Sequence, residues 1–109
     1  MLEPLLGSEN KERVLIFLHA REEGYATEIA RFFQTNLYGI QTQLDRLETG
    51  GILLSRKVGR TRVYRFNPRY ALVEELEALL EKALGFYPDD LHDRLQMDRR
   101  RPRLRGKPI

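Results

Sequence analysis

Apolar residues in the first half of the chain recur every three or four positions, and short polar or glycine-containing stretches separate the runs. This periodicity predicts three helices, over residues 9–21, 25–33 and 37–48. Candidate N-caps are Ser8 or Asn10 for the first helix and Asn36 for the third, while the second helix begins at either Tyr25 or Thr27. Residues 14–18 are apolar without interruption, so we expect neighbouring elements to surround the first helix as the centre of the core.

The second half of the chain begins with a β-hairpin pattern. β-Branched and aromatic residues on both sides of a glycine predict strands over residues 52–58 and 61–66, joined by a turn at Gly59 and Arg60. Residues 52–54 are all apolar, so the pattern leaves open which side of the first strand faces the core.

A fourth helix is predicted over residues 70–84 and a short fifth one over residues 88–97. The apolar stripe of the fourth helix is too wide for one contact within a protomer. We expect the surplus to pair with a second copy of the chain, together with Leu2, Leu5 and Leu6. The expected dimer-interface residues are Leu72, Leu76, Leu79, Leu80 and Ala83. An intramolecular role of this stripe, against the first helix, is the alternative.

The order helix, helix, helix, hairpin, helix is that of a winged helix-turn-helix, a mainly α fold with a small β-hairpin wing. We expect this domain, with its C-terminal dimerisation helix, to span residues 1–84. A short helical extension is expected over residues 85–97 and a basic, disordered tail over residues 98–109. The length of the chain suits a single domain.

Positive charge is concentrated in two segments, although the net charge is only +3. Residues 56–69 hold six basic residues and no acid, and residues 98–109 hold six basic residues against one acid. Because phosphate attraction depends on the local field rather than on total charge, these segments favour a nucleic-acid partner. A solvated face and a solubilising tail are the alternative.

The third predicted helix has two different faces. One is apolar and is expected to lie on the core: Leu37, Ile40, Leu44 and Leu47. The other is largely uncharged and able to form hydrogen bonds, unlike an ordinary solvated face: Tyr38, Gln41, Thr42 and Asp45. Glutamine can pair with adenine edges in the major groove and threonine with several bases, which makes this helix a candidate for base recognition. Asp45 is expected to point at bases or away from the duplex.

Two further features complete the predicted DNA-binding surface. Gly39, in the first turn of the third helix, allows a close approach of backbone to phosphate or is a neutral choice at a tolerant position. Cations cluster on the arms and turn of the hairpin, where arginine suits phosphate contacts. The predicted DNA-binding residues are Asn36, Tyr38, Gly39, Gln41, Thr42, Arg56, Lys57, Arg60, Thr61 and Arg62.

Residues 8–80 resemble the ArsR-type winged helix-turn-helix domain of bacterial and archaeal regulators. The segments that carry the resemblance are Glu28 to Ala30, Ile40 to Leu44, Gln43 to Leu53 and Val58 to Phe66. The resemblance implies a symmetric dimer with the third helix in the major groove and each wing on flanking backbone. The opening segment, Leu5 to Ser8, is also similar to that of small winged-helix modules found beside nucleotidyltransferase domains.

The residue types present argue against several other functions. The chain has no cysteine, so thiolate metal sites and cysteine nucleophiles are excluded. His19 and His92 are isolated in the sequence, and no downstream aspartate pair follows Gly7 and Ser8 as nucleotidyl transfer would need. We therefore expect no metal site, no cofactor, no catalytic residues and no enzymatic activity.

The sequence thus predicts a sequence-specific, double-stranded DNA-binding transcriptional regulator that acts as a homodimer. Without an apolar span or a leader pattern, a cytoplasmic protein with no membrane partner is expected. Two alternatives remain open: a protein–protein adaptor or antitoxin-like partner on a winged-helix scaffold, and a nonspecific nucleic-acid binder.

Overall fold

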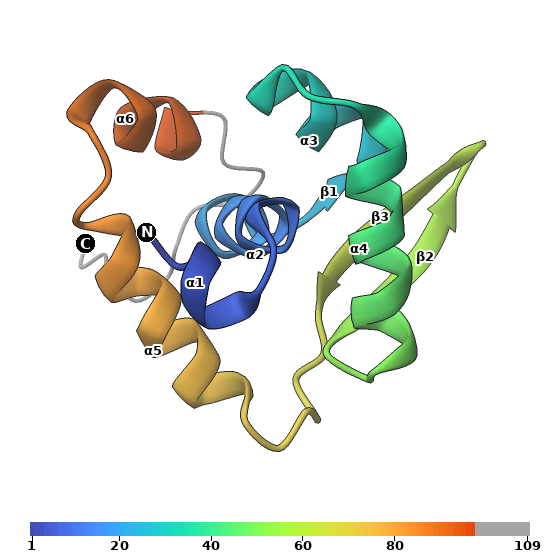
Figure 1. Ribbon diagram of the computed structural model, residues 1–109. Coiled ribbons are helices and arrows are strands. Elements are labelled where there is room, and N and C mark those ends of the chain that lie inside the picture. The colour runs from blue at the N-terminus through green and yellow to red at the C-terminus, as the bar shows by residue number, and fades with distance from the viewer. Residues whose placement is uncertain (98–109) are drawn as a thin grey trace, which may run out of the picture.

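The computed structural model describes residues 1–97, which form six helices and three strands (Figure 1). In chain order the elements are α1 (Glu3–Leu6), α2 (Glu9–Arg21), β1 (Gly24–Tyr25), α3 (Ala26–Phe33), α4 (Leu37–Thr49), β2 (Leu53–Val58), β3 (Thr61–Phe66), α5 (Val73–Leu84) and α6 (Asp89–Met97). This arrangement confirms the predicted fold class, a mainly helical winged helix. The predicted basic tail, residues 98–109, lies outside the described residues. Within residues 1–97, no helix has both the length and the apolar character needed to cross a membrane.

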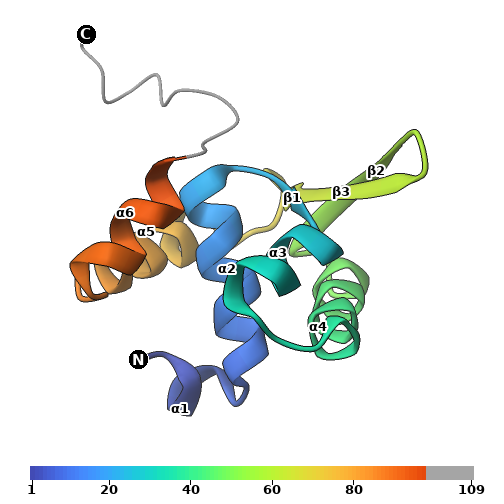
Figure 2. The ribbon, with the colours of Figure 1, turned by 90° about the horizontal axis from the view of Figure 1, so that it is seen from above.

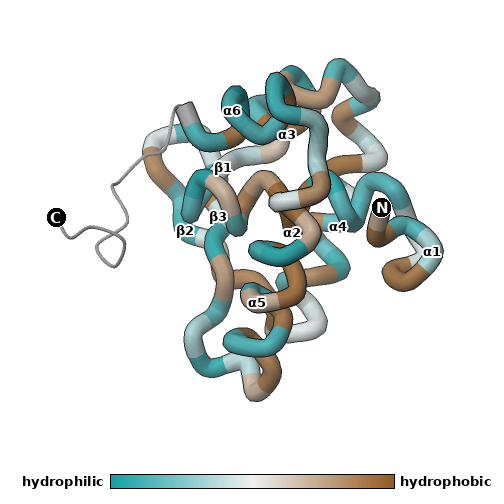
Figure 3. Tube along the Cα trace, turned by 90° about the vertical axis from the view of Figure 1, so that its left-hand side faces the viewer, coloured by the Kyte–Doolittle hydropathy of each residue, from teal (hydrophilic) through white to brown (hydrophobic). Residues whose placement is uncertain are grey.

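Helix α2 is the centre of the core. Ser8 Oγ accepts a hydrogen bond from the Lys11 N–H at 3.1 Å, so Ser8 rather than Asn10 is its N-cap. Side chains from residues 14–20 are all buried, because α1, α3, α4, α5 and α6 pack around this helix. Figures 1 and 2 show α2 in the middle of the molecule, and Figure 3 shows its hydrophobic stretches enclosed by neighbouring elements. The uninterrupted apolar run therefore reflects contact on several sides.

Helices α3 and α4 form the helix-turn-helix pair. Gln34 ends α3 in a left-handed conformation, with φ of 54°, which redirects the chain within a few residues. The Tyr38 N–H then donates to Asn36 Oδ1 at 2.7 Å, which confirms Asn36 as the N-cap of α4. Helix α4 packs against both α2 and α3.

The wing belongs to a three-stranded sheet with the order β1-β3-β2. Strands β2 and β3 are antiparallel and pair from Leu53 opposite Phe66 to Val58 opposite Thr61. The two-residue strand β1 pairs with β3 at its other edge, and two residues are too few for a strand pattern to be seen in the sequence. Leu53 is buried, whereas the side chain of the next residue is exposed, which decides the orientation that the sequence left open.

Helix α6 packs on α2 and joins the same core, in which Leu95 is fully buried. The buried Arg21 guanidinium holds the last turns of α6: Nε donates to the Leu95 carbonyl at 3.2 Å and Nη2 to the Arg94 carbonyl at 2.9 Å. The same guanidinium lies 5.0 Å from the centre of the Phe32 ring. From this segment, Leu95 belongs to the core, and Tyr87 and Leu91 pack against it.

A buried carboxylate ties the N-terminal segment to the loop before α6. Glu12 accepts hydrogen bonds from the Tyr87 hydroxyl at 2.6 Å and from the Leu2 N–H at 3.0 Å. Burial acts to raise the pKa of Glu12, but these hydrogen bonds and the Met1 ammonium group outweigh it, so the pKa is lowered overall. The carboxylate is thus held in its charged form.

Candidate nucleic-acid interface

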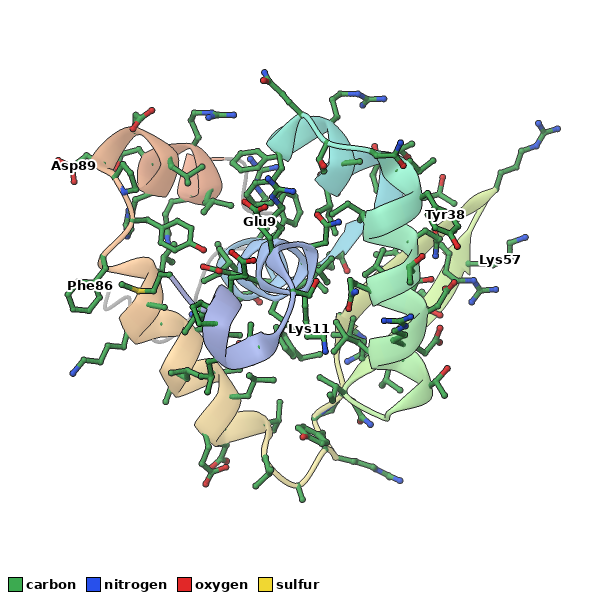
Figure 4. The ribbon with its side chains drawn as sticks, viewed as in Figure 1. Glu9, Lys11, Tyr38, Lys57, Phe86 and Asp89 are labelled. Atoms are coloured by element: carbon green, nitrogen blue, oxygen red, sulfur yellow. The ribbon has the colours of Figure 1, made fainter. Side chains whose placement is uncertain are left out.

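The outer face of α4 presents largely uncharged polar side chains, with the exposed Asp45 as its charged member. Tyr38 is 78% exposed, and Figure 4 shows it on the same side of the molecule as the wing residue Lys57. The Thr42 hydroxyl donates to the Tyr38 carbonyl at 2.9 Å, so its oxygen can still accept a hydrogen bond and its methyl group can make apolar contacts. Asn36 is exposed at the start of this face, where its side chain caps the helix.

The expectation that Leu37 faces the core is wrong. Leu37 is 45% exposed and lines a cleft beside the wing, while Ile40, Leu44 and Leu47 are buried as predicted. The first turn of α4 extends past the core, so the apolar stripe of this helix is covered only from its second turn onward.

Gly39 is half-buried and lies beside Asn10 of α2. A Cβ at this position would meet the end of the Asn10 side chain, which would have to move aside. The absence of a side chain at Gly39 therefore leaves room for Asn10, and the predicted approach of its backbone to phosphate stays a prediction.

Gln41 is held by a small hydrogen-bond network between α4 and the wing. Its Nε2 donates to Asp45 Oδ1 at 3.0 Å and to the Tyr64 hydroxyl at 3.2 Å. Tyr64 is only 2% exposed, and burial raises the pKa of its hydroxyl. The Gln41 hydrogen bond acts in the opposite direction, while the charges of Asp45 and Glu48 raise this pKa further. The hydroxyl is therefore neutral at physiological pH and available as an acceptor.

The cations of the wing fall into two groups. Arg56 forms an ion pair with Glu23 at 3.2 Å, and Arg62 donates to Ser55 Oγ at 3.0 Å. Lys57 and Arg60 are exposed, and neither has a hydrogen-bond or ion-pair partner among residues 1–97. These two side chains retain their full charge for an outside ligand.

A cleft of about 450 Å³ separates α4 from the wing. The start of α3, one side of α4 and the wing line it, and it contains Thr61 together with groups of both signs. Glu48 at its edge accepts a hydrogen bond from the Ser55 hydroxyl at 2.6 Å, which connects the end of α4 to β2. The cleft places acceptors of α4 opposite cations of the wing.

The predicted dimer-interface residues divide into two sets. Leu80 and Ala83 are buried within the protomer, so they are not available to a second copy in this arrangement. Leu72 is 57% exposed, Leu79 is 37% exposed, and Leu76 is half-buried. Of the N-terminal residues proposed to join them, Leu5 is exposed, Leu6 is half-buried and Leu2 is buried. One side of the apolar stripe on α5 thus packs in the core, and its other side faces outward.

His19 has a partner on each ring nitrogen. Nδ1 lies 2.6 Å from Glu77 Oε1, and Nε2 lies 2.6 Å from Glu81 Oε1, so the ring joins α2 to α5. Within residues 1–97, no three side chains of the metal-binding types gather in a way that could hold a metal ion. His19 is therefore a structural link between two helices.

Sequence reasoning missed Tyr64, Ser55 and Glu48 as members of this site. Their contacts join α4 to the wing. The sequence pattern within a single helix or strand does not show which residues of these two elements will meet. Asp45 belongs to the predicted polar stripe of α4. The four-residue spacing allows a hydrogen bond between Asp45 and Gln41, but this bond can be expected only once both side chains are known to face the cleft.

Comparison with known proteins adds support for the fold. No family model matches the chain, and no curated protein sequence matches it significantly. Among solved structures, the chain is similar to a mutant of ZitR from Lactococcus lactis in its apo form, with a TM-score of 0.55. The match covers 85% of this chain and 73% of that chain at 14% sequence identity. Likeness at this identity shows a shared winged-helix fold, and the resemblance to ArsR-type regulators stays a prediction.

Proposed function

We propose that this chain is a regulator that binds double-stranded DNA in a sequence-specific manner, with α4 in the major groove and the wing on the neighbouring backbone. One observation carries the proposal: helix α4, which bears the largely uncharged polar face, and the β2–β3 wing, which bears the unpaired cations Lys57 and Arg60, lie on the same side of the molecule (Figure 2). The winged-helix fold and the segments similar to ArsR-type regulators support the same function.

The two parts of this surface have different tasks. Lys57 and Arg60 suit phosphate, so they supply affinity that depends on salt but not on sequence. Tyr38, Gln41 and Thr42 suit base edges and so supply sequence preference. A nonspecific binder would need only the first set, and the uncharged face of α4 favours a specific one.

We propose that the protein acts as a homodimer through the outward side of α5. Leu79 of α5 is 37% exposed, and the exposed apolar residues Leu72 and Phe86 lie just outside the two ends of this helix. These three side chains are the apolar face through which we propose that two copies pair. Two copies paired along this face could set their α4 helices about 34 Å apart, one turn of duplex DNA.

The function is tested by selecting bound fragments from a library of random DNA duplexes and sequencing them. We expect the wild-type protein to enrich a two-fold symmetric site. Replacing Gln41 and Thr42 by alanine should abolish the enrichment but leave residual, salt-sensitive binding, because the wing remains intact. Equal binding to all sequences by the wild type would indicate a nonspecific binder, and a lack of DNA binding would favour the adaptor function.

The dimer is tested separately by light scattering. Leu79→Glu should give a monomer, because the new carboxylate would lie in the apolar face. Ala78→Glu adds the same charge at the neighbouring exposed position of α5 and serves as the matched control. A monomeric wild-type protein at micromolar concentration would overturn the proposed assembly.

A further inference from the structure

The amide of Gln41 has a fixed orientation. Asp45 Oδ1, 3.0 Å away, is a carboxylate oxygen and can only accept, so the Gln41 atom that faces it must be the nitrogen. The second Gln41 N–H donates to the Tyr64 hydroxyl at 3.2 Å. A glutamine amide has two N–H groups, and both are therefore occupied within the protein.

What remains on this side chain is an acceptor. Within the described residues, 1–97, no group donates to Gln41 Oε1. Asp45 adds a carboxylate on the next turn of the helix, and it is exposed. The centre of the α4 face thus presents acceptor oxygens and no free donor from Gln41.

This pattern excludes the usual way in which glutamine recognises a base. Glutamine pairs with adenine by accepting from N6 and donating to N7, and the donation needs an N–H that Gln41 does not have free. Guanine and thymine present acceptors in the major groove, which would face the acceptors of the protein. Adenine presents a donor, N6, but its N7 acceptor lies beside it and would face the second acceptor oxygen of the Gln41–Asp45 pair. Cytosine presents the N4 amino group, a donor, and carboxylates accept from it.

We infer that Gln41 and Asp45 together read the N4 amino group of a cytosine in the major groove, and that Tyr64 sets this preference by occupying the glutamine N–H. Tyr64 is a positioning residue, since it is buried on β3 and acts through Gln41. Its depth in the core keeps the hydroxyl in place when α4 enters the groove. The inference rests on the proposed DNA-binding function and names the base chemistry that this surface takes.

The hydrogen bonds around Gln41 also explain how the carboxylate of Asp45 can lie on a face that contacts DNA. A carboxylate near phosphates is unfavourable unless hydrogen bonds satisfy its oxygens. Asp45 Oδ1 accepts from Gln41, and the cytosine amino group would supply a second donor. The pair is therefore better suited to a base edge than to the backbone.

The experiment uses the full chain and a library of random DNA duplexes, followed by sequencing of the bound fraction. The base position read by α4 is the one whose preference Gln41→Ala removes. At that position we expect the wild type to select cytosine over the other bases by roughly five- to a hundredfold. Tyr64→Phe releases one N–H of Gln41, so adenine should gain at this position at the expense of cytosine. Asp45→Asn should relax the cytosine preference, and because Asp45 is exposed this variant tests the inference even if Tyr64→Phe does not fold.

Tyr70→Phe is the matched control, because it removes a tyrosine hydroxyl with no hydrogen-bond partner in the described part of the chain. It should leave the selected sequence unchanged. If wild-type protein selects a site, but with adenine, guanine or thymine at the position read by Gln41, the inference is wrong while the proposed function stands. The inference is also wrong, and the proposed function still stands, if both Tyr64→Phe and Asp45→Asn select the wild-type sequence. If the wild type binds no DNA, both the inference and the proposed function are overturned.

Discussion

The wing gives the sharpest quantitative test of DNA binding. Arg60→Ala removes a cation that is exposed and has no partner among residues 1–97, so its loss should change the affinity for DNA and not the contacts within the protein. Each phosphate contact contributes about 0.9 to the slope of log affinity against log salt. Since a dimer carries two wings, the slope should become less steep by about 1.8.

This change in slope converts into a measurable ratio. When salt rises fourfold, from about 50 to about 200 mM, the affinity gap between wild type and Arg60→Ala should shrink about 12-fold. The measurement is a titration of labelled duplex, followed by fluorescence anisotropy, at four or more salt concentrations. Lys57→Ala should behave in the same way, because Lys57 has the same exposed, unpaired character.

Arg69→Ala is the matched control for this test. Arg69 is an exposed cation, but it follows the end of β3 that lies opposite the turn of the wing. Its removal changes the net charge by the same amount and should leave the slope unchanged. Equal slopes for wild type, Arg60→Ala and Lys57→Ala would refute the contact between wing and backbone. A slope reduced by the same amount in Arg69→Ala would show that net charge alone is responsible.

Two further predictions concern the core that positions this surface. Arg21→Met removes the donors to the last carbonyls of α6. Loss of this buried, paired charge should lower the free energy of unfolding by about 3 kcal/mol, measured by urea denaturation. An unchanged denaturation midpoint would contradict the role of Arg21 in holding Leu95 and its neighbours. Glu12 has a lowered pKa, so it stabilises the fold above about pH 4.3 and loses this effect as the pH falls through its own pKa. Glu12→Gln should therefore be less stable than wild type at pH 7, and the difference should shrink at pH 3; a difference that stays constant with pH would contradict the assignment.

The elements that could be predicted from the sequence are those that depend on residues close to one another in the chain. Helices appear where apolar residues recur at helical spacing, and Asn36 caps α4 because its side chain reaches an N–H two residues ahead. The hairpin needs only Gly59, in its left-handed conformation with φ of 64°, and the β-branched arms around it. These features are local, so a pattern within one element is enough to predict them, although α5 begins at Val73 because the turns before it take three residues from the predicted helix.

Which side chains remain accessible to a ligand depends on how the elements pack against one another. Leu37 is exposed, whereas Gly39, in the same turn of α4, lies beside Asn10 of α2. Leu80 is buried because α5 packs on α2. The Tyr64 hydroxyl accepts a hydrogen bond from one N–H of Gln41, although the two residues are more than 20 positions apart in the chain. Such contacts depend on how helices and strands are placed against one another, and a periodic pattern specifies the face of a helix but not the partner that covers it.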